Sequence, residues 1–346
     1  MTDSKAFIDA LTRRDLAAIR RVPKSDLHNH GLASGNRDFI RERTGRDIAP
    51  VTQPLRSMAE MHAWFDANIA PVFKSLPPDE AHRLGREAPF VQARLNGVTR
   101  IEFGEDVWMV SQGQGTAREL AAKLSDIHAR TAPQVEFIPL LGLSRHCSFR
   151  ALDSWLAPFL EFDFFRSFDL SGDEFAQPIE TFAPLYRKAR AHGLRLKAHV
   201  GEWGTADDVW RAVELLELDE VQHGIAAADS PAVMRMLADN GIPLNVCPTS
   251  NLLLGRVESM RAHPIRKLFD AGIKITVNTD DALVFGASVS DEFRALYEAG
   301  LFTAQELDTI RLNGLGGLGW VPFFREQFLS PIHMALPASS NAFVRR

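Results

Sequence analysis

Short runs of apolar residues recur along this chain, and each is followed by a stretch with the spacing of an amphipathic helix. Apolar runs that end at turn-forming residues are typical of buried strands, whereas apolar residues three and four positions apart indicate helices. Strands that alternate with helices pair in parallel. By this pattern the sequence predicts eight strands, at 25–30, 98–104, 135–143, 165–170, 194–200, 220–224, 242–247 and 273–279.

The stretches between the strands carry helix start and stop signals. Ser230 followed by Pro231 is typical of a capped helix start, and Gly193 and Gly241 are typical of residues that end helices. The clearest predicted helices are 116–130, 178–192, 206–216 and 231–240.

Eight strand–helix units predict an α/β protein that is a single (β/α)₈ barrel of the TIM type. The length of 346 residues fits one such barrel or a pair of smaller domains, and no long linker separates two parts, so we expect one domain over residues 1–346. An open doubly wound sheet is the alternative. It is disfavoured because no G-x-G-x-x-G motif follows the first strand.

Two segments fall outside the repeat. Residues 1–24 have the pattern of one amphipathic N-terminal helix. Residues 32–97 are too long for a simple crossover and are expected to form a helical insertion after the first strand. Within it, residues 58–73 place Met61, Trp64, Phe65 and Val72 at helical spacing. This helix packs its apolar face on the barrel or forms a lid over the active site, since insertions after barrel strands lie on the catalytic face, and the two interpretations are compatible.

Composition and charge restrict the partners. The 39 basic and 44 acidic side chains give a net charge of −5, so nucleic acid is not expected as a partner. Cys147 and Cys247 are too few for a disulfide framework, which suits a reducing compartment. No run approaches the roughly 20 apolar residues of a membrane span, and charged residues interrupt the N-terminal segment, unlike a signal peptide. We therefore expect a cytoplasmic, globular protein with no membrane partner.

Ionisable residues gather at the ends of the predicted strands. In the first strand, alternation places Asp26, His28 and His30 on one face. Two imidazoles two positions apart can share a metal ion, although an H-x-H motif alone is weak evidence. The fifth strand leads to His199 and is soon followed by Glu202. All strand ends of this kind lie on the same face of a barrel, where the catalytic groups of barrel enzymes are found.

The sixth and eighth strands end in the same manner, in His223 and in Asp280–Asp281. Each residue has a structural explanation, because a buried histidine often bonds a carbonyl and paired aspartates often cap a helix. Their conjunction at one face favours a site instead. A nitrogen and oxygen ligand set suited to one zinc ion, with a position left for water, is provided by His28, His30, His199 and Asp280. Glu202, His223 and Asp281 remain as acid–base groups around that water.

Taken in order, these motifs resemble those of the adenosine deaminase family. The resemblance extends from about residue 25 to residue 293, and the H-x-G-E, Q-H-G and T-D-D motifs are specific when they occur together. The matching segments are His28-x-His30, Ser171–Gly172–Asp173–Glu174, His199-x-Gly-Glu202, Gln222–His223–Gly224, Cys247–Pro248–Thr249–Ser250–Asn251 and Asn278–Thr279–Asp280–Asp281.

The resemblance implies a zinc-dependent barrel enzyme that hydrolytically removes the 6-amino group of an adenine-type base, giving the 6-oxo purine and ammonia. It assigns the metal to the same four ligands, one Zn²⁺ per chain. It assigns the proton-donor role to Glu202 and activation of the water to His223 and Asp281. Substrate contacts are expected from Gly172, which faces the edge of the base, and from His30 and Asp281.

The chain departs from the family pattern at three positions. An acidic residue that contacts the sugar usually stands two positions after the second histidine, and here that position is Leu32. Ala282 replaces the proline that usually follows the T-D-D motif, and Trp203 stands where smaller residues are common and is expected to narrow the pocket. Adenosine or a closely related nucleoside is the expected substrate, and the alternatives are free adenine or a 5′-modified adenosine such as aminodeoxyfutalosine.

Three rival classes fit less well. Zinc nucleobase deaminases with H-x-E and P-C-x-x-C motifs need cysteines that this chain lacks. Many two-metal barrel hydrolases carry a bridging lysine, and no lysine stands at the end of the predicted fourth strand, so a mononuclear amidohydrolase of another specificity remains the closer alternative. A binding protein without activity would be expected to have lost a ligand or the proton donor, and neither is missing.

Overall fold

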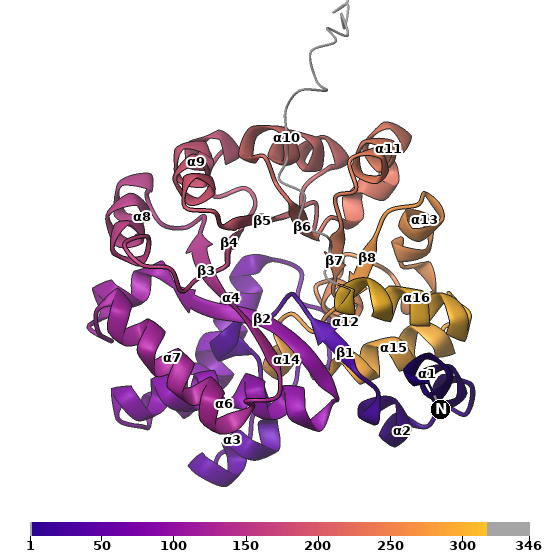
Figure 1. The fold of residues 1–346 in the computed structure, drawn as a ribbon, viewed down its shortest axis with the longest axis horizontal. Helices are drawn as coiled ribbons and strands as arrows, with labels where there is room; N and C mark the ends of the chain where they lie inside the picture. Colours follow the sequence, from indigo (N-terminus) through magenta and orange to yellow (C-terminus); the bar gives the residue numbers. More distant parts are fainter. Residues whose placement is uncertain (1, 317–346) are drawn as a thin grey trace, which may run out of the picture.

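The computed structural model describes residues 2–316, and within that range the chain forms the predicted barrel. Parallel strands follow one another in chain order, and helices surround them (Figure 1). The end of the predicted domain, residues 317–346, lies outside the described residues. The strands are β1 (Lys24–Asp26), β2 (Val98–Asp106), β3 (Glu136–Ser144), β4 (Ser167–Ser171), β5 (Arg195–Val200), β6 (Glu220–His223), β7 (Leu244–Val246) and β8 (Ile275–Val277).

Most of the α-helices begin at a residue whose side chain caps them. Ser230 accepts the backbone N–H of Val233 with Pro231 in the first turn, as predicted, and Gly193 and Gly241 follow their helices at positive φ. The α-helices are α1 (Asp3–Thr12), α2 (Leu16–Arg21), α3 (Arg37–Thr44), α4 (Met58–Asn68), α5 (Ala70–Lys74), α6 (Pro78–Leu95), α7 (Ala117–Thr131), α8 (Phe149–Leu156), α9 (Ala183–Ala191), α10 (Ala206–Leu216), α11 (Pro231–Asp239), α12 (Pro248–Leu253), α13 (Ile265–Asp270), α14 (Ala282–Phe285), α15 (Val289–Glu298) and α16 (Ala304–Leu315). Short 3₁₀ helices are η1 (Gly31–Ala33), η2 (Val107–Gln112), η3 (Ala157–Phe159), η4 (Ile179–Phe182), η5 (Ile225–Asp229) and η6 (Met260–Ala262).

The barrel closes between β1 and β8 at the carboxyl ends of the strands. Asn29 and Asp280 form an isolated parallel bridge, and the backbone N–H of Asp280 donates to the carbonyl of His28 across 2.9 Å. Lower down, the side-chain oxygen of Asn278 accepts the backbone N–H of Leu27 at 2.7 Å. Polar side chains thus take over part of the role of the backbone ladder where the two strands diverge.

The first strand is shorter than predicted. The prediction that Asp26 shares one face of this strand with His28 and His30 is therefore wrong. β1 ends at Asp26, so regular alternation does not continue to His28 and His30. The Asp26 carboxylate instead accepts the backbone N–H and the hydroxyl of Thr279, at 3.2 and 2.6 Å. Asp26 therefore ties β1 to the segment after β8 and takes no part in the histidine cluster.

Helix α16 covers the seam between β1 and β8 from outside. A Cβ at Gly314 would lie 1.9 Å from Oγ of Ser25 and 3.7 Å from the Thr276 methyl group. Only glycine permits this approach of helix to strand. The close packing supports the part of the barrel where the ladder is incomplete.

The N-terminal segment forms two helices, so the prediction of one helix over residues 1–24 is wrong. Arg14 has a φ of 55°, which interrupts the helical backbone, and Asp15 caps α2 through the backbone N–H of Ala18. None of the helices in residues 2–316 combines the length and apolar character that a membrane span requires.

The insertion after β1 contains several helices, as predicted, but residues 58–73 are divided between α4 and α5. Pro71 lies in the first turn of α5, and proline cannot donate the hydrogen bond that would continue α4. Met61, Trp64 and Phe65 are half-buried against a second apolar cluster that includes Ile69 and is separate from the main core. The apolar face of α4 thus packs on the protein, as one of the two interpretations expected.

Candidate active site

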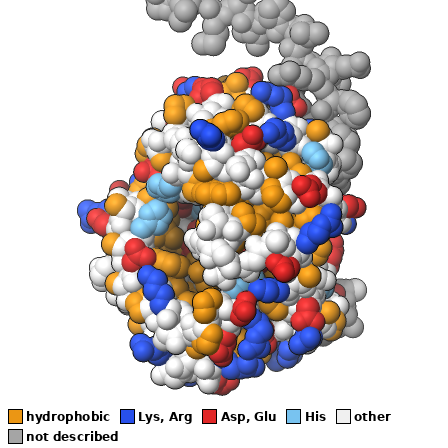
Figure 2. Space-filling view, turned by 90° about the vertical axis from the view of Figure 1, so that its left-hand side faces the viewer, with side chains coloured by type: hydrophobic (Ala, Val, Ile, Leu, Met, Phe, Trp, Pro, Cys, Tyr) orange, Lys and Arg blue, Asp and Glu red, His pale blue; other side chains and the backbone are white. Residues whose placement is uncertain are grey.

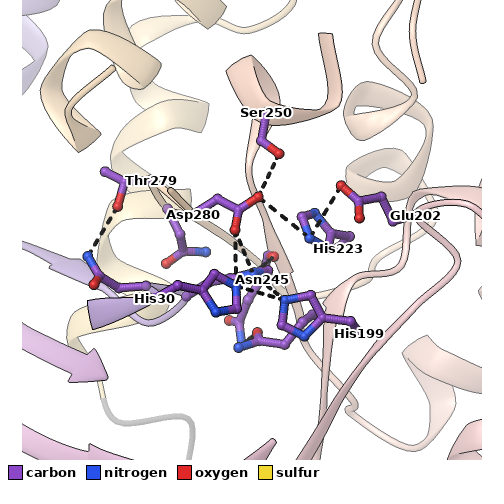
Figure 3. A network of polar contacts seen from close by, with 12 residues as sticks. His30, His199, Glu202, His223, Asn245, Ser250, Thr279 and Asp280 are labelled. Atoms are coloured by element: carbon purple, nitrogen blue, oxygen red, sulfur yellow. Dashed lines mark hydrogen bonds and ion pairs between the residues drawn. The ribbon is translucent and has the colours of Figure 1, made fainter. Parts of the chain in front are cut away.

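Three imidazoles and one carboxylate meet beyond the ends of β1, β5 and β8. Nε2 of His199 lies 2.9 Å from Nε2 of His28 and 3.0 Å from Nε2 of His30. Oδ1 of Asp280 lies 3.1 Å from Nε2 of His30 and 3.5 Å from Nε2 of His28. Figure 3 shows the side chains of His30, His199 and Asp280 directed toward one another. The four predicted ligands come together in space.

The cluster has the donors and the spacing of a tetrahedral zinc site. Zinc bonds of about 2.0–2.1 Å separate tetrahedral ligand atoms by about 3.3–3.4 Å, and the distances in the cluster run from 2.9 to 3.5 Å. Three ring nitrogens that converge cannot all be satisfied by hydrogen bonds to one another, because each bond between two rings needs its own proton. A cation between them resolves the conflict, so these residues fit one metal ion.

Burial and nearby carboxylates set the charge of the ligand rings. Burial lowers the pKa of His28 to about 3, so this ring is neutral at pH 7, the form that binds metals. Burial also lowers the pKa of His30, but Asp281 and Asp280 outweigh it and raise the pKa to about 10. A metal that binds His30 must therefore displace a proton.

Two rings of the candidate ligand set, those of His28 and His199, have a partner at Nδ1, the ring nitrogen that is not directed at the cluster. Nδ1 of His28 lies 3.1 Å from the backbone oxygen of Asn245, and Nδ1 of His199 lies 3.1 Å from Oδ2 of Asp169. Partners of this kind orient the ring and select the tautomer that leaves Nε2 free for a metal. Sequence reasoning assigned no role to Asp169, although a charged residue between apolar neighbours on a buried strand was a usable signal.

Asp280 and His223 adopt a backbone conformation that non-glycine residues rarely adopt. Their φ values are 57° and 60°, and such a conformation costs about 1–3 kcal/mol unless its surroundings impose it. At Asp280 the surroundings include Ser250, whose hydroxyl donates to Oδ2 across 2.6 Å and leaves Oδ1 to the histidine cluster (Figure 3). Strained residues concentrate at functional sites, which supports a functional role for both.

Glu202 is a buried carboxyl beside the ligand cluster, and its surroundings favour the protonated form. Burial raises its pKa well above the usual range, and the neighbouring carboxylates of Asp280 and Glu174 raise it further. Its Oε1 lies 3.5 Å from Nε2 of His223. A carboxyl with a raised pKa beside the cluster has the properties of a general acid.

Glu174 holds the backbone of the segment that carries Glu202. No separate role was predicted for Glu174, which stands in the sequence only as one residue of a family motif. The Glu174 carboxylate accepts the backbone N–H groups of Gly201, Glu202 and Trp203 at 2.8, 2.9 and 2.7 Å. Trp203 was expected to narrow the pocket, but it is not among the described residues that line the cavity. Its ring stacks under the guanidinium of Arg256 at 4.6 Å instead.

A chain of hydrogen bonds determines which nitrogen of His223 carries its proton. The backbone N–H of Ile265 donates to Nδ1 of His263 at 3.1 Å, so Nε2 of His263 is the protonated nitrogen and donates to Oδ1 of Asn251 at 3.2 Å. The amide group of Asn251 then donates to Nδ1 of His223 at 3.3 Å. Neutral His223 therefore presents an Nε2–H, and burial keeps it neutral by lowering its pKa.

The cluster opens into a cavity of about 410 Å³. One face of the molecule is visibly hollowed, with hydrophobic side chains in the recess and histidine at its edge (Figure 2). Burial raises the pKa of Asp281 to about 7, and the charge of Asp280 adds to the effect. The sequence-predicted residues that line the cavity are His30, Gly172, His199, Glu202, His223, Asp280 and Asp281.

The insertion forms a wall of this cavity. Met58, Met61 and Phe65 of α4 line it, so α4 contacts both the apolar cluster and the site. Leu32 also lines the cavity, while its side chain packs against α6, where a Cβ at Gly85 would lie 2.6 Å from its Cδ1. Leu32, which replaces the acidic residue usual in the family, therefore lies beside the space for substrate.

The fold and the site define the class of an amidohydrolase-like barrel with a candidate site for one metal ion. A family model described as adenosine deaminase matches residues 154–329. An adenine deaminase of Acinetobacter baylyi is 38% identical over 319 residues, which cover 85% of this chain and 92% of that protein. The chain belongs to the adenosine deaminase family and is a hydrolytic deaminase acting on C–N bonds.

Two further proteins show the range of the family. An aminodeoxyfutalosine deaminase of Streptomyces avermitilis is 29% identical over 316 residues, covering 84% of this chain and 85% of that protein. An amidohydrolase of Burkholderia ambifaria, whose crystal structure contains bound zinc, is 25% identical with a TM-score of 0.71, covering 90% of this chain and 88% of that one.

Proposed function

We propose that this protein is a zinc-dependent deaminase that removes the 6-amino group of an adenine-type purine, as the base or as a nucleoside. The observation that carries the proposal is the position of a buried carboxyl with a raised pKa, Glu202, beside the ligand cluster of His28, His30, His199 and Asp280. The reaction consumes one water and yields the 6-oxo purine and ammonia.

The cluster supports one zinc ion held by these four residues. Zinc, when bound there, supplies a water acidic enough to react as hydroxide near neutral pH, with a pKa of about 7. The bound zinc in the Burkholderia ambifaria relative supports this choice of metal.

Glu202 donates its proton to N1 of the purine ring as water adds to the neighbouring C6. The developing negative charge on N1 is thereby neutralised, which is the step that a carboxyl with a raised pKa performs best. Glu174 supports this role by fixing the backbone of Glu202 and both neighbouring residues.

His223 and Asp281 have different roles toward the attacking water. Because Nε2 of His223 already carries a proton, this ring donates a hydrogen bond and orients the oxygen. Asp281, with a pKa of about 7, accepts the proton that the water loses. Asp281 then gives this proton to the amino group, ammonia leaves, and the hydroxyl proton on C6 returns to Glu202 as the 6-oxo purine forms.

Ammonia release from purified, zinc-loaded protein tests the proposal. The substrates are adenine, adenosine, 2′-deoxyadenosine and 5′-substituted adenosines, with cytidine as a control that carries an amino group on a pyrimidine. We expect ammonia from at least one adenine compound and none from cytidine. Absence of ammonia from every adenine compound, with zinc bound, contradicts the proposal.

A further inference from the structure

Asp106 is a carboxylate in the cavity that the proposed mechanism does not use. It is the last residue of β2 and lines the cavity. Within residues 2–316 its side chain has no hydrogen-bond or ion-pair partner. The neighbouring cation Arg86 is already engaged, because it donates from Nε and Nη2 to the two oxygens of Glu105 at 3.1 and 2.8 Å.

The neighbouring strand makes room for this carboxylate. Gly142 on β3 is the register partner of Asp106, and a Cβ at Gly142 would lie 2.3 Å from Oδ1 of Asp106. The carboxylate therefore lies over the bare backbone of β3, at a place that another residue type would block. Burying a carboxylate without a hydrogen-bond partner costs free energy. The position of Asp106 beside a cavity therefore points to a ligand that supplies the missing hydrogen-bond donor.

The strand order places Asp106 on the far side of the barrel mouth from the proposed acid Glu202. In an eight-stranded barrel β5, which Glu202 follows, faces β1 across the mouth, and β2, which ends in Asp106, is the neighbour of β1. A purine whose C6 lies at the ligand cluster and whose N1 meets Glu202 turns its five-membered ring away from Glu202. N9 belongs to the edge remote from N1, so it is directed toward the side of β2 and β3.

We propose that Asp106 accepts a hydrogen bond from N9–H of a free 6-aminopurine base, so that the enzyme acts on the base and not on its nucleosides. The inference rests on the proposed function and selects among its substrates. A nucleoside carries its sugar on N9 and has no proton there to donate. Its sugar would lie against Asp106 and leave the carboxylate without the N9–H donor.

The lining of the cavity supports the same choice. Leu32, Met61 and Phe65 give it apolar surface, although His62 and His146 also line it. Burial raises the pKa of Asp106 to about 6, so the carboxylate is mostly charged above pH 7 and accepts hydrogen bonds. The N9–H of a free base can donate to this charged acceptor, whereas a nucleoside has no proton on N9.

Comparison of adenine, 9-methyladenine and adenosine tests the proposal. For the unaltered enzyme, kcat/KM for adenine is expected to exceed that for either N9-substituted compound by at least about 100-fold, because a missing N–H leaves a buried charge unpaired. Adenine should also raise the melting temperature of the protein more than 9-methyladenine does. These measurements need no variant.

Substitution then identifies the residue. Asp106→Ala should lower kcat/KM for adenine by about 10- to 100-fold and leave 9-methyladenine unchanged or improved. Asp106→Asn, which keeps an acceptor oxygen, should recover part of the loss. Asp38→Asn, on the exposed side of α3, is the matched control and should change neither substrate. Zinc content should be equal in all variants.

Several outcomes would overturn the inference. If kcat/KM of the unaltered enzyme were as high for adenosine as for adenine, N9–H would not be recognised. An equal loss for adenine and 9-methyladenine in Asp106→Ala would indicate a structural role only. No ammonia from any adenine compound would instead refute the proposed function, whereas an active deaminase with the wrong preference refutes only the assignment to Asp106.

Discussion

The side-chain amide of Asn251 donates a hydrogen bond to Nδ1 of His223 across 3.3 Å. The opposite orientation of the amide is excluded, because His263 already accepts the backbone N–H of Ile265 at Nδ1 and must donate from Nε2 to the oxygen of Asn251. A backbone group on one helix thus determines that His223 presents an N–H, and not a lone pair, to the site.

Asn251→Asp is predicted to lower kcat at least about tenfold while zinc content stays unchanged. A carboxylate at position 251 accepts from Nδ1 of His223, so the proton moves to Nδ1 and Nε2 no longer donates to the attacking oxygen. Metal analysis and steady-state kinetics on the preferred adenine compound measure both quantities. Unchanged kcat would mean that the tautomer of His223 does not matter.

Glu202→Gln is predicted to retain zinc and substrate binding but to lower kcat roughly 10²- to 10⁴-fold, the usual contribution of a general acid. The amide keeps the size of the side chain and cannot transfer a proton to the ring. Glu214→Gln, on the exposed face of α10, is the control. A loss below tenfold with full zinc content would exclude Glu202 as the donor.

His199→Ala is predicted to lose zinc and activity together. Its Nε2 is the atom that lies closest to both other rings, at 2.9 and 3.0 Å, so its removal opens the ligand set. Elemental analysis of protein purified without chelator should give one zinc per chain for the unaltered protein and for the exposed control His192→Ala. A variant with full zinc would show that the ligand set is wrong.

Glu292→Gln is predicted to increase stability at high pH relative to low pH. Burial raises the pKa of Glu292 to about 8 in the folded protein, against 4.5 for an ordinary glutamate, although it accepts the backbone N–H of Thr249. Between these values the unfolded chain loses a proton that the folded chain keeps, so stability falls as pH rises and the full penalty is present above pH 8.

Denaturant unfolding at pH 5 and pH 8.5 measures this effect. The advantage of Glu292→Gln over the unaltered protein should grow by more than about 1.4 kcal/mol between the two pH values, the equivalent of one pKa unit. Glu298→Gln, exposed on the same helix, should show no such change. An equal difference at both pH values would mean that Glu292 is ionised normally in the fold.

Much of the architecture could be predicted because it depends on local periodicity. The eight apolar runs are the eight strands, and Ser230 with Pro231 begins a helix as expected. The errors fall where backbone geometry departs from the local rule. Arg14 divides the N-terminal helix, and β1 ends at Asp26 because the barrel closes there through side chains.

The sequence by itself determined the barrel, the family resemblance and the residues that gather at the strand ends, because strand periodicity and motif order are written along the chain. Only the tertiary structure decided how those residues face one another. Asp169, Glu174 and Asn251 hold residues of the candidate site from a strand, a turn and a helix elsewhere in the chain, and no spacing along the chain reveals such contacts. The unpaired state of Asp106 is likewise a property of its surroundings, since it depends on Arg86 being engaged elsewhere.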